Sequence, residues 1–322
     1  MNLHRTKPHG AEPDRTTRRS TRQRVKRALI GVCAFVVAMT LGVAGLAAAW
    51  LAGYKLPLAS GATYLRVQKL RTAGDADKSH SPTAPFYVLL VGNDDRPGVG
   101  GARGDALHLV GVNPRLRRAT MLNIPRDTCW NGDKINAANA QGGGPAQAAA
   151  VGGLVGVPVS YVVDVNFDKF QALVDGVGGV VINIPFEMHD SYSGAFFHPG
   201  VQRLNGNQAL AFSRDRHDFP SSDIVRTGNQ GLLILAAIAQ LQHDTTHVGG
   251  QFKLISMLYR HADLSGFGLI DLYRLGRIMY RIPPTQIRSA TIPIGGGGCL
   301  SLGGDAAGFF ADFRDDAVLQ SH

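Results

Sequence analysis

Short apolar runs separated by polar or glycine-containing turns recur along the chain from Pro85 onward. Runs of this length are typical of buried strands, and the segments between them suit helices. The predicted strands cover residues 86–92, 106–113, 119–124, 159–167 and 180–184. The predicted helices cover residues 144–155, 168–177, 207–212, 223–242, 252–261 and 269–280. Strands interleaved with helices indicate a three-layer α/β/α sandwich, and short links such as 113–115 indicate antiparallel pairs within a mixed central sheet.

The N-terminal region carries a membrane signal. Residues 1–27 contain nine Lys or Arg against Glu12 and Asp14, and the 23 residues of 28–50 contain no charged side chain. As a helix, 28–50 would reach about 34 Å, enough to cross a hydrocarbon core of about 30 Å. Because the basic block comes first, we expect a cytoplasmic tail, a single transmembrane anchor and an extracytoplasmic remainder. A signal peptide cleaved near Ala47–Ala49 is the alternative, but the apolar stretch is longer than a usual signal sequence and favours an uncleaved anchor.

The basic tail also explains most of the charge. It contributes +7 (nine basic minus two acidic side chains) to the formal net charge of +9. The tail has no aromatic residue and lies directly before the predicted span, so topology accounts for it better than nucleic-acid binding does. We therefore expect no nucleic-acid partner, and the remainder of the chain is close to neutral.

The rest of the chain divides into three parts. Residues 51–84 are polar and read as an extracytoplasmic linker with one short helix near 61–70. Residues 85–300 are long and apolar enough for one globular domain with a sizeable core. Residues 301–322 read as a loosely held tail.

The three cysteines fit an external location. Cys33 lies within the predicted span, which leaves Cys129 and Cys299 as an even pair in an oxidising compartment. We predict that these two form a disulfide, with two unpaired thiols as the alternative.

The stretch NIPRDT, residues 123–128, is the most informative motif. Pro125 cannot donate a hydrogen bond to a strand partner, so the strand over 119–124 should end there and leave Arg126 and Asp127 at its end. Ligands collect at strand ends in open α/β sheets, where Arg suits phosphate oxygens and Asp suits a divalent cation. An isolated surface ion pair is the alternative for these two residues alone.

Other polar side chains fall at the ends of predicted elements. They are Asp94 and Arg96 after the first strand, Arg103 and Asp105 before the second, Arg214 and Arg216 after the helix 207–212, and Asp223, Arg226 and Gln230 at the start of the helix 223–242. Residues two apart in an extended chain face the same side, so Arg103 would lie beside Asp105, and Arg214 beside Arg216 if that segment is extended. Asp223 would cap its helix, and Arg226 and Gln230 would share one face.

Carboxylates that can hold Mg²⁺ beside guanidiniums that bind phosphate indicate phosphoryl transfer. An external location excludes most nucleotide substrates, and the chain has no P-loop sequence. A lipid-linked pyrophosphate is the phosphorylated substrate that we expect outside a membrane.

The combination of motifs resembles the LytR-CpsA-Psr (LCP) family of envelope phosphotransferases. The matching stretches are VGNDDR, RGDALHLV, NIPRDT with KINAA, VNFDKFQALVDGVGGV, LNGNQALAFSRDRH and DIVRTGNQ. The resemblance implies an α/β/α sandwich with a polyprenyl tail in an apolar tunnel and a pyrophosphate at its mouth. It further implies transfer of a glycopolymer from a polyprenyl-pyrophosphate carrier to a peptidoglycan hydroxyl, which forms a phosphodiester and releases polyprenyl phosphate.

The resemblance also implies roles for individual residues. Asp94 and Asp105 would hold Mg²⁺, with Mn²⁺ as an alternative, Arg103 would act on the leaving phosphate, and Asp127 or a metal carboxylate would remove the hydroxyl proton. The pyrophosphate would be bound by Arg96, Arg103, Arg126, Lys134, Arg214, Arg216, Arg226 and Gln230. The chain departs from the family pattern at Asn93, Asp95, Gly104 and Asn229.

Two other functions fit the same residues. One is a hydrolase that releases the phosphorylated glycan to water, and the other is a non-catalytic carrier-binding or regulatory membrane protein. The histidines His108, His189, His198 and His217 read as ordinary strand or loop residues.

Overall fold

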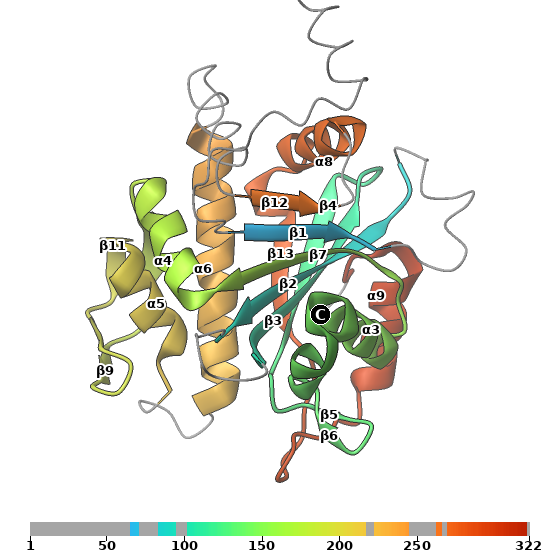
Figure 1. Cartoon of the computed structure of the whole chain (residues 1–322), viewed down its shortest axis with the longest axis horizontal. Coiled ribbons are helices and arrows are strands. Elements are labelled where there is room, and N and C mark those ends of the chain that lie inside the picture. The colour runs from blue at the N-terminus through green and yellow to red at the C-terminus, as the bar shows by residue number, and fades with distance from the viewer. Residues whose placement is uncertain are drawn as a thin grey trace, which may run out of the picture. The chain divides into compact units, whose positions relative to one another are not determined.

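The structure, a computed structural model, centres on a mixed β-sheet (Figure 1). It describes residues 65–70, 83–94, 102–216, 222–244, 262–265 and 269–320, all within one compact unit, Ser60–His322. The predicted cytoplasmic tail and transmembrane anchor lie outside the described residues. The same holds for the predicted helix 252–261 and for Arg96 and His217.

Seven strands form the central sheet within the described residues. In chain order they are β1 (Leu65–Lys69), β2 (Phe86–Asn93), β3 (Gly104–Asn113), β4 (Arg118–Ile124), β7 (Val159–Asn166), β12 (Ala262–Ser265) and β13 (Ile287–Thr291). Their spatial order is β12-β1-β7-β2-β3-β4-β13. β2 and β7, β4 and β13, and β1 and β12 run parallel, and the other neighbours run antiparallel. The prediction of a mixed central sheet is confirmed.

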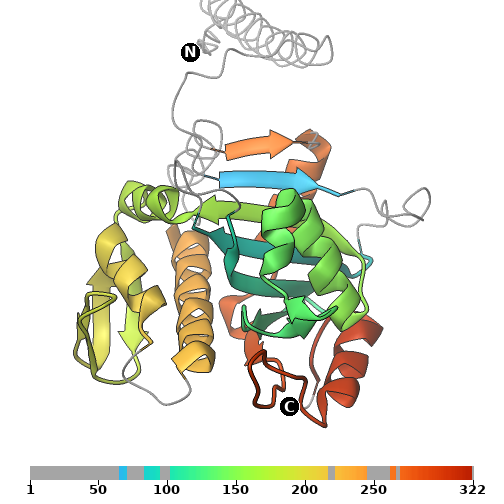
Figure 2. The same cartoon turned by 60° about the horizontal axis from the view of Figure 1, so that its bottom comes forward.

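Helices cover both faces of the sheet (Figure 1). They are α3 (Ala137–Val155), α4 (Phe167–Gly176), α5 (Gly206–Arg214), α6 (Ser222–Asp244), α8 (Leu269–Arg281) and α9 (Ala306–Asp316), with a short 3-10 helix η1 (Pro284–Gln286). α3 and α9 lie on one face, and α6 crosses the other, with α5 packed against α6 and α4 against α5 (Figure 2). The expected helices over 144–155, 168–177, 207–212, 223–242 and 269–280 are all present; α4 is shifted by one residue, and the others extend beyond the predicted bounds.

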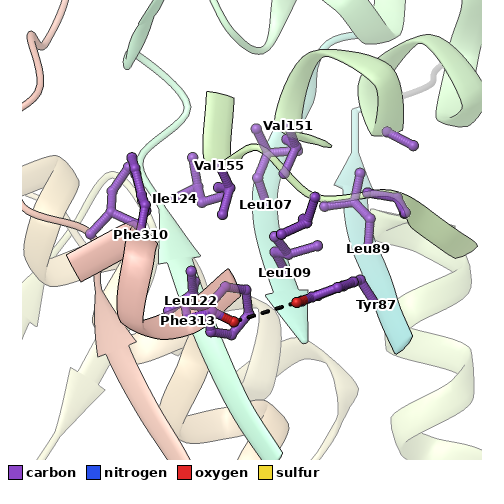
Figure 3. Close-up of a cluster of buried hydrophobic side chains, with 14 of the residues drawn as sticks. Tyr87, Leu89, Leu107, Leu109, Leu122, Ile124, Val151, Val155, Phe310 and Phe313 are labelled. Carbon is purple, nitrogen blue, oxygen red and sulfur yellow. Dashed lines mark hydrogen bonds between the residues drawn. The ribbon is translucent and has the colours of Figure 1, made fainter. Parts of the chain in front are cut away.

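The main core lies between the sheet and the α3–α9 layer (Figure 3). Leu89 of β2 and Leu107 and Leu109 of β3 all point into this core and are fully buried. The Tyr87 hydroxyl donates a hydrogen bond of 3.4 Å to the carbonyl of Phe313 in α9, which ties the last helix to the sheet.

Two segments near the ends of the domain differ from the prediction. The expected helix near 61–70 is wrong, because β1 pairs with both β7 and β12 there. The expected loose tail 301–322 includes α9, whose Phe309, Phe310 and Phe313 are buried. Both segments gain their structure from distant partners, so their local sequence gave little signal.

A smaller lobe continues from α4 and α5 (Figure 2). It contains the pair β8 (Val180–Ile184) and β11 (Gly200–Leu204) and the hairpin of β9 (Met188–Asp190) and β10 (Ala195–Phe197). A second apolar cluster fills the space between these strands, α5 and α6. β5 (Cys129–Trp130) and β6 (Asp133–Lys134) form a separate small hairpin after β4.

Among the described residues, one helical segment has the length and apolar composition of a membrane span, Asp223–His243 in α6. α6 contacts β3, β4, β8 and β13, so it forms a layer of the folded domain. Its composition is therefore weak evidence for a span.

Candidate active site

The sequence-predicted residues meet where β2 ends, β3 begins, β4 ends and α6 begins. Asn93, the last residue of β2, pairs with Gly104, the first residue of β3, after a register shift. Asp94 follows Asn93 and Arg103 precedes Gly104, so both lie just beyond the ends of neighbouring strands. The loop after Pro125 brings Arg126 to the same place.

Arg126 is the centre of an ion-pair network. Its Nη1 lies 2.5 Å from Asp105 Oδ1. Its Nε lies 3.8 Å from Asp127 Oδ1 and 3.8 Å from Asp223 Oδ1. Burial acts to lower the pKa of Arg126, but the hydrogen bond to Asp105 and the three carboxylate charges outweigh it and raise the pKa. Arg126 is therefore a fixed cation.

The first turn of α6 supplies a second cation. Asp223 lies in this first turn, and its carboxylate accepts a hydrogen bond from Arg226. Burial lowers the pKa of Arg226 to about 10, and the positive charges of Arg126 and Arg216 act in the same direction. A guanidinium with this pKa remains charged at neutral pH, so three arginines hold positive charge close together.

Asp127 is held from two sides. Lys134 Nζ lies 3.1 Å from Asp127 Oδ1, and Leu300 N donates a 2.8 Å hydrogen bond to the Asp127 carbonyl. Cys129 and Cys299 are disulfide-bonded, and Cys129 N donates to the Leu300 carbonyl. The disulfide and two backbone hydrogen bonds fix the loop that carries Arg126.

Arg214 and Arg216 do not share an extended segment. Arg214 is the last residue of α5, and its guanidinium lies 5.8 Å from the centre of the Phe167 ring. Arg216 N donates a 3.1 Å hydrogen bond to Asp190 Oδ2, and the charge of Arg216 acts on the pKa of Arg226, so the two arginines lie near each other. The condition for a common orientation, an extended segment, is not met, because helix α5 continues to Arg214.

Arg103 and the two predicted metal carboxylates lie at adjacent strand ends. Arg103 is exposed and has no ion pair with the described residues. Asp94 and Asp105 are partly buried. No group of three His, Cys, Asp or Glu side chains arranged for a metal occurs in the described part of the chain. Mg²⁺ usually takes only one or two carboxylates and completes its shell with water and phosphate oxygens, so the oxygen donors of Asp94 and Asp105 are of the kind that it binds.

Several buried polar atoms around the arginines have no hydrogen-bond partner among the described residues. They are Arg126 Nε, Arg216 Nε, Arg226 Nε, Asp223 Oδ2, Asn229 Nδ2 and Gln230 Oε1. Buried polar atoms are normally paired, so their concentration here indicates a site built to receive a polar ligand or ordered water. Four of the six belong to α6, whose N-terminal end favours anions.

An apolar cavity opens beside this cluster. It has a volume of about 180 Å³ and lies between the strands β2, β3 and β7 and the helices α4, α5 and α6. Its wall is almost entirely aliphatic and aromatic, with His108, Ser213 and Gln230 as its polar side chains. A polar cluster beside an apolar cavity suits a ligand with a charged head and a hydrocarbon tail.

His108 belongs to a buried polar chain that the sequence did not reveal. Its Nδ1 lies 2.8 Å from Asn123 Oδ1, and Asn123 Nδ2 donates a 2.8 Å hydrogen bond to Ser289 Oγ. Burial lowers the pKa of His108 to about 4, although hydrogen bonds to Asn123 and Gln230 oppose the shift. His108 is a strand residue, as expected, and its neutral imidazole also forms part of the cavity wall.

Asp190 carries no signal in the sequence, whereas Phe167 stands in the motif VNFDKFQALVDGVGGV, where an aromatic side chain is more typical of the core than of a lipid tunnel. Asp190 is 1% exposed and orients Arg216, and Phe167 supports Arg214 and lines the cavity. Asp190 belongs to the smaller lobe and Phe167 begins α4, and only the tertiary fold brings both residues to the arginines.

Comparison with known proteins agrees with this picture. Over 246 residues the chain is 32% identical to the polyisoprenyl-teichoic acid–peptidoglycan teichoic acid transferase TagU of Bacillus subtilis (strain 168), covering 74% of this chain and 78% of TagU. It is 37% identical over 179 residues to TagU of Bacillus licheniformis, covering 53% of this chain and 58% of that protein.

Solved structures share the fold. The B. subtilis TagU crystal structure has a TM-score of 0.55 at 25% identity, covering 74% of this chain and 99% of that chain. A LytR-Csp2A-Psr enzyme from Actinomyces oris has a TM-score of 0.63 at 22% identity, covering 79% of this chain and 96% of that chain, which shows the fold alone. The model of the LytR_cpsA_psr family matches residues 59–304, and this chain belongs to that family.

Proposed function

We propose that this protein transfers a glycopolymer from a polyprenyl-pyrophosphate carrier to a hydroxyl of peptidoglycan, forming a phosphodiester and releasing polyprenyl phosphate. Its relative TagU is named a polyisoprenyl-teichoic acid–peptidoglycan teichoic acid transferase. Membership of the same family supports a transferase of this class.

The observation that carries the proposal is the junction of a cationic cluster with an apolar cavity. Gln230 lines the cavity and lies one turn after Arg226 in α6, so the arginine cluster and the cavity adjoin. The buried Nε atoms of Arg126, Arg216 and Arg226 have no hydrogen-bond partner among the described residues and are available for phosphate oxygens. The aliphatic wall beside them suits the first isoprene units of the carrier. A soluble sugar phosphate has no hydrocarbon part that could pack against that wall.

Asp94 and Asp105 would hold Mg²⁺, or Mn²⁺, at the pyrophosphate. When bound, the metal supplies positive charge to the phosphate oxygens and lowers the cost of the negative charge that develops during transfer. Asp105 also fixes Arg126 at 2.5 Å, so one carboxylate would serve both the metal and the arginine.

The chain's other residues would orient the reacting groups. The acceptor oxygen attacks the glycan-linked phosphorus, the bond from that phosphorus to the bridging oxygen breaks, and the electron pair leaves with polyprenyl phosphate. Arg103 is exposed and unpaired among the described residues, so it can turn to the leaving phosphate. Asp127 lies between Arg126 and Lys134 and would either orient them or accept the hydroxyl proton.

We further propose that the protein is a single-pass membrane protein with a cytoplasmic N-terminus and an external catalytic domain. The uncharged segment 28–50 after a basic block supports this topology. The disulfide between Cys129 and Cys299 supports an oxidising location for the domain.

The test is a transfer assay with the full-length chain, a polyprenyl-pyrophosphate-linked glycan labelled in the sugar, Mg²⁺ and peptidoglycan. We expect label to enter peptidoglycan and polyprenyl phosphate to form in equal amounts. Arg126→Ala should lower the rate at least about 100-fold, the range seen when one charge-stabilising donor is removed. Chelation of divalent cations should abolish transfer, and added Mg²⁺ should restore it.

Arg118→Ala is the matched control, because Arg118 is an exposed arginine at the start of β4 that hydrogen-bonds Gln286 away from the cluster. It should leave the rate unchanged. Release of free phosphorylated glycan at the same rate with and without peptidoglycan would show a hydrolase. Full transfer by Arg126→Ala would exclude the proposed site.

A further inference from the structure

The β9–β10 hairpin exposes aromatic side chains next to the candidate site. Phe196 pairs with His189 across the hairpin, and their neighbours Met188 and Phe197 point inward and are buried. The alternation of a strand therefore turns Phe196 and His189 outward. Phe196 is 60% exposed, and Tyr192 in the turn is 81% exposed.

Polar side chains lie beside Phe196 on this hairpin. Glu187 Oε1 lies 2.7 Å from His198 Nδ1 and 3.0 Å from His189 Nε2. The His189 ring meets the Phe196 ring edge to face at 6.3 Å. We call these five side chains, Glu187, His189, Tyr192, Phe196 and His198, the hairpin face. Since the described residues contain no three-ligand cluster arranged for a metal, its carboxylate and imidazoles are better read as hydrogen-bonding groups.

A buried carboxylate joins the hairpin face to the arginine cluster. Asp190 is 1% exposed, and its Oδ1 accepts a 2.9 Å hydrogen bond from Tyr192 N. Its Oδ2 accepts a 3.1 Å hydrogen bond from Arg216 N. The hairpin turn and Arg216 are thus bound to the two oxygens of one side chain. The hairpin turn therefore lies close to the backbone of Arg216.

We propose that the hairpin face binds sugar rings of the peptidoglycan acceptor, an inference that rests on the proposed transfer function. The C–H faces of pyranose rings pack on exposed aromatic rings, and their hydroxyls pair with carboxylates and imidazoles. Tyr and Phe beside Glu and His supply both kinds of contact within one short hairpin. The face is open, as the binding of a long polymer requires.

The acceptor needs such a surface more than the donor does. The donor glycan is covalently attached to the phosphate and is held when the phosphate and lipid bind. The acceptor arrives as a separate molecule, and its hydroxyl must be brought into line by its own contacts. A stable protein partner would bury about 20–30 residues a side, many more than the hairpin face presents.

The test compares the full-length chain with the double variant Tyr192→Ala, Phe196→Ala. The probes are soluble, uncrosslinked peptidoglycan chains and the lipid-linked donor, varied separately. We expect the KM for peptidoglycan to rise at least tenfold while the KM for the donor stays within twofold. Direct binding of the peptidoglycan chains without donor should weaken by the same factor. Val201→Ala removes a side chain that is 73% exposed on β11 of the same lobe, and it should change neither quantity.

Each other outcome overturns the proposal in a distinct way. An unchanged KM and unchanged binding of peptidoglycan would mean that the hairpin face does not bind the acceptor. A parallel loss of donor affinity would mean that the hairpin acts by positioning Arg216 instead. If the unaltered chain transfers nothing to peptidoglycan, the proposed function fails, and the binding measurement alone then decides whether the hairpin face recognises sugar.

Discussion

Acidification should destabilise this protein through His108, because its imidazole is buried beside the cavity and stays neutral when folded. Burial lowers its pKa from 6.5 to about 4. In the unfolded chain the imidazole takes up a proton below its ordinary pKa, whereas in the folded chain it does so only near pH 4. The unfolded state therefore binds more protons in this range, and stability is lost as the pH falls from 6.5 toward 4.

The size of the effect follows from the two pKa values. Their difference corresponds to a loss of about 3 kcal/mol once the pH is below both, at about 1.4 kcal/mol per pKa unit. Between pH 7 and pH 5, proton linkage gives a loss of about 2 kcal/mol from this one side chain. His108 is 1% exposed, so solvent screening does not reduce the figure appreciably.

The assay is denaturant unfolding of the full-length chain and of His108→Gln at pH 7 and pH 5 in the same detergent. Glutamine can keep a hydrogen bond toward Asn123 but cannot titrate. We expect His108→Gln to be less stable than the original chain at pH 7 and to lose about 2 kcal/mol less between pH 7 and pH 5.

Ser289→Ala is the control, because it cuts the same polar chain at its other end without removing the imidazole. It should lower the free energy of unfolding by about 1 kcal/mol at both pH values. If the original chain and His108→Gln lose equal stability between pH 7 and pH 5, the reasoning on His108 is refuted.

Three further changes test the fold by denaturant unfolding. Replacing both Cys129 and Cys299 by Ser should lower the free energy of unfolding by about 5 kcal/mol on the chain-entropy model, since the disulfide spans 170 residues. No loss would mean that the pair does not constrain the unfolded chain. Gly111→Ala should cost about 3 kcal/mol, because its Cβ would lie 2.3 Å from the Ala317 carbonyl; a neutral result would contradict the tight docking of α9. Asn205→Ala should cost about 1 kcal/mol by removing the capping box of α5, and unchanged stability would count against that cap.

The sequence by itself determined the strands and helices that carry their own pattern. The run before Pro125 is apolar and ends at a residue that cannot extend a sheet, so β4 and the position of Arg126 followed from local chemistry. The strong motifs also determined the family, which the family model and TagU confirm.

The tertiary structure alone decided which side chains meet. β1 forms because it pairs with a distant strand, and α9 forms because its aromatic side chains pack into the core. Neither contact is visible in the local sequence, which predicted a helix and a loose tail instead. The positions of Asp190 and His108 depend on folding, which buries both side chains. The backbone N–H of Arg216 then lies beside Asp190, and the side-chain amide of Asn123 lies beside His108. Desolvation and contact between distant segments arise only in the packed chain, so they cannot be read from the residues of one segment alone.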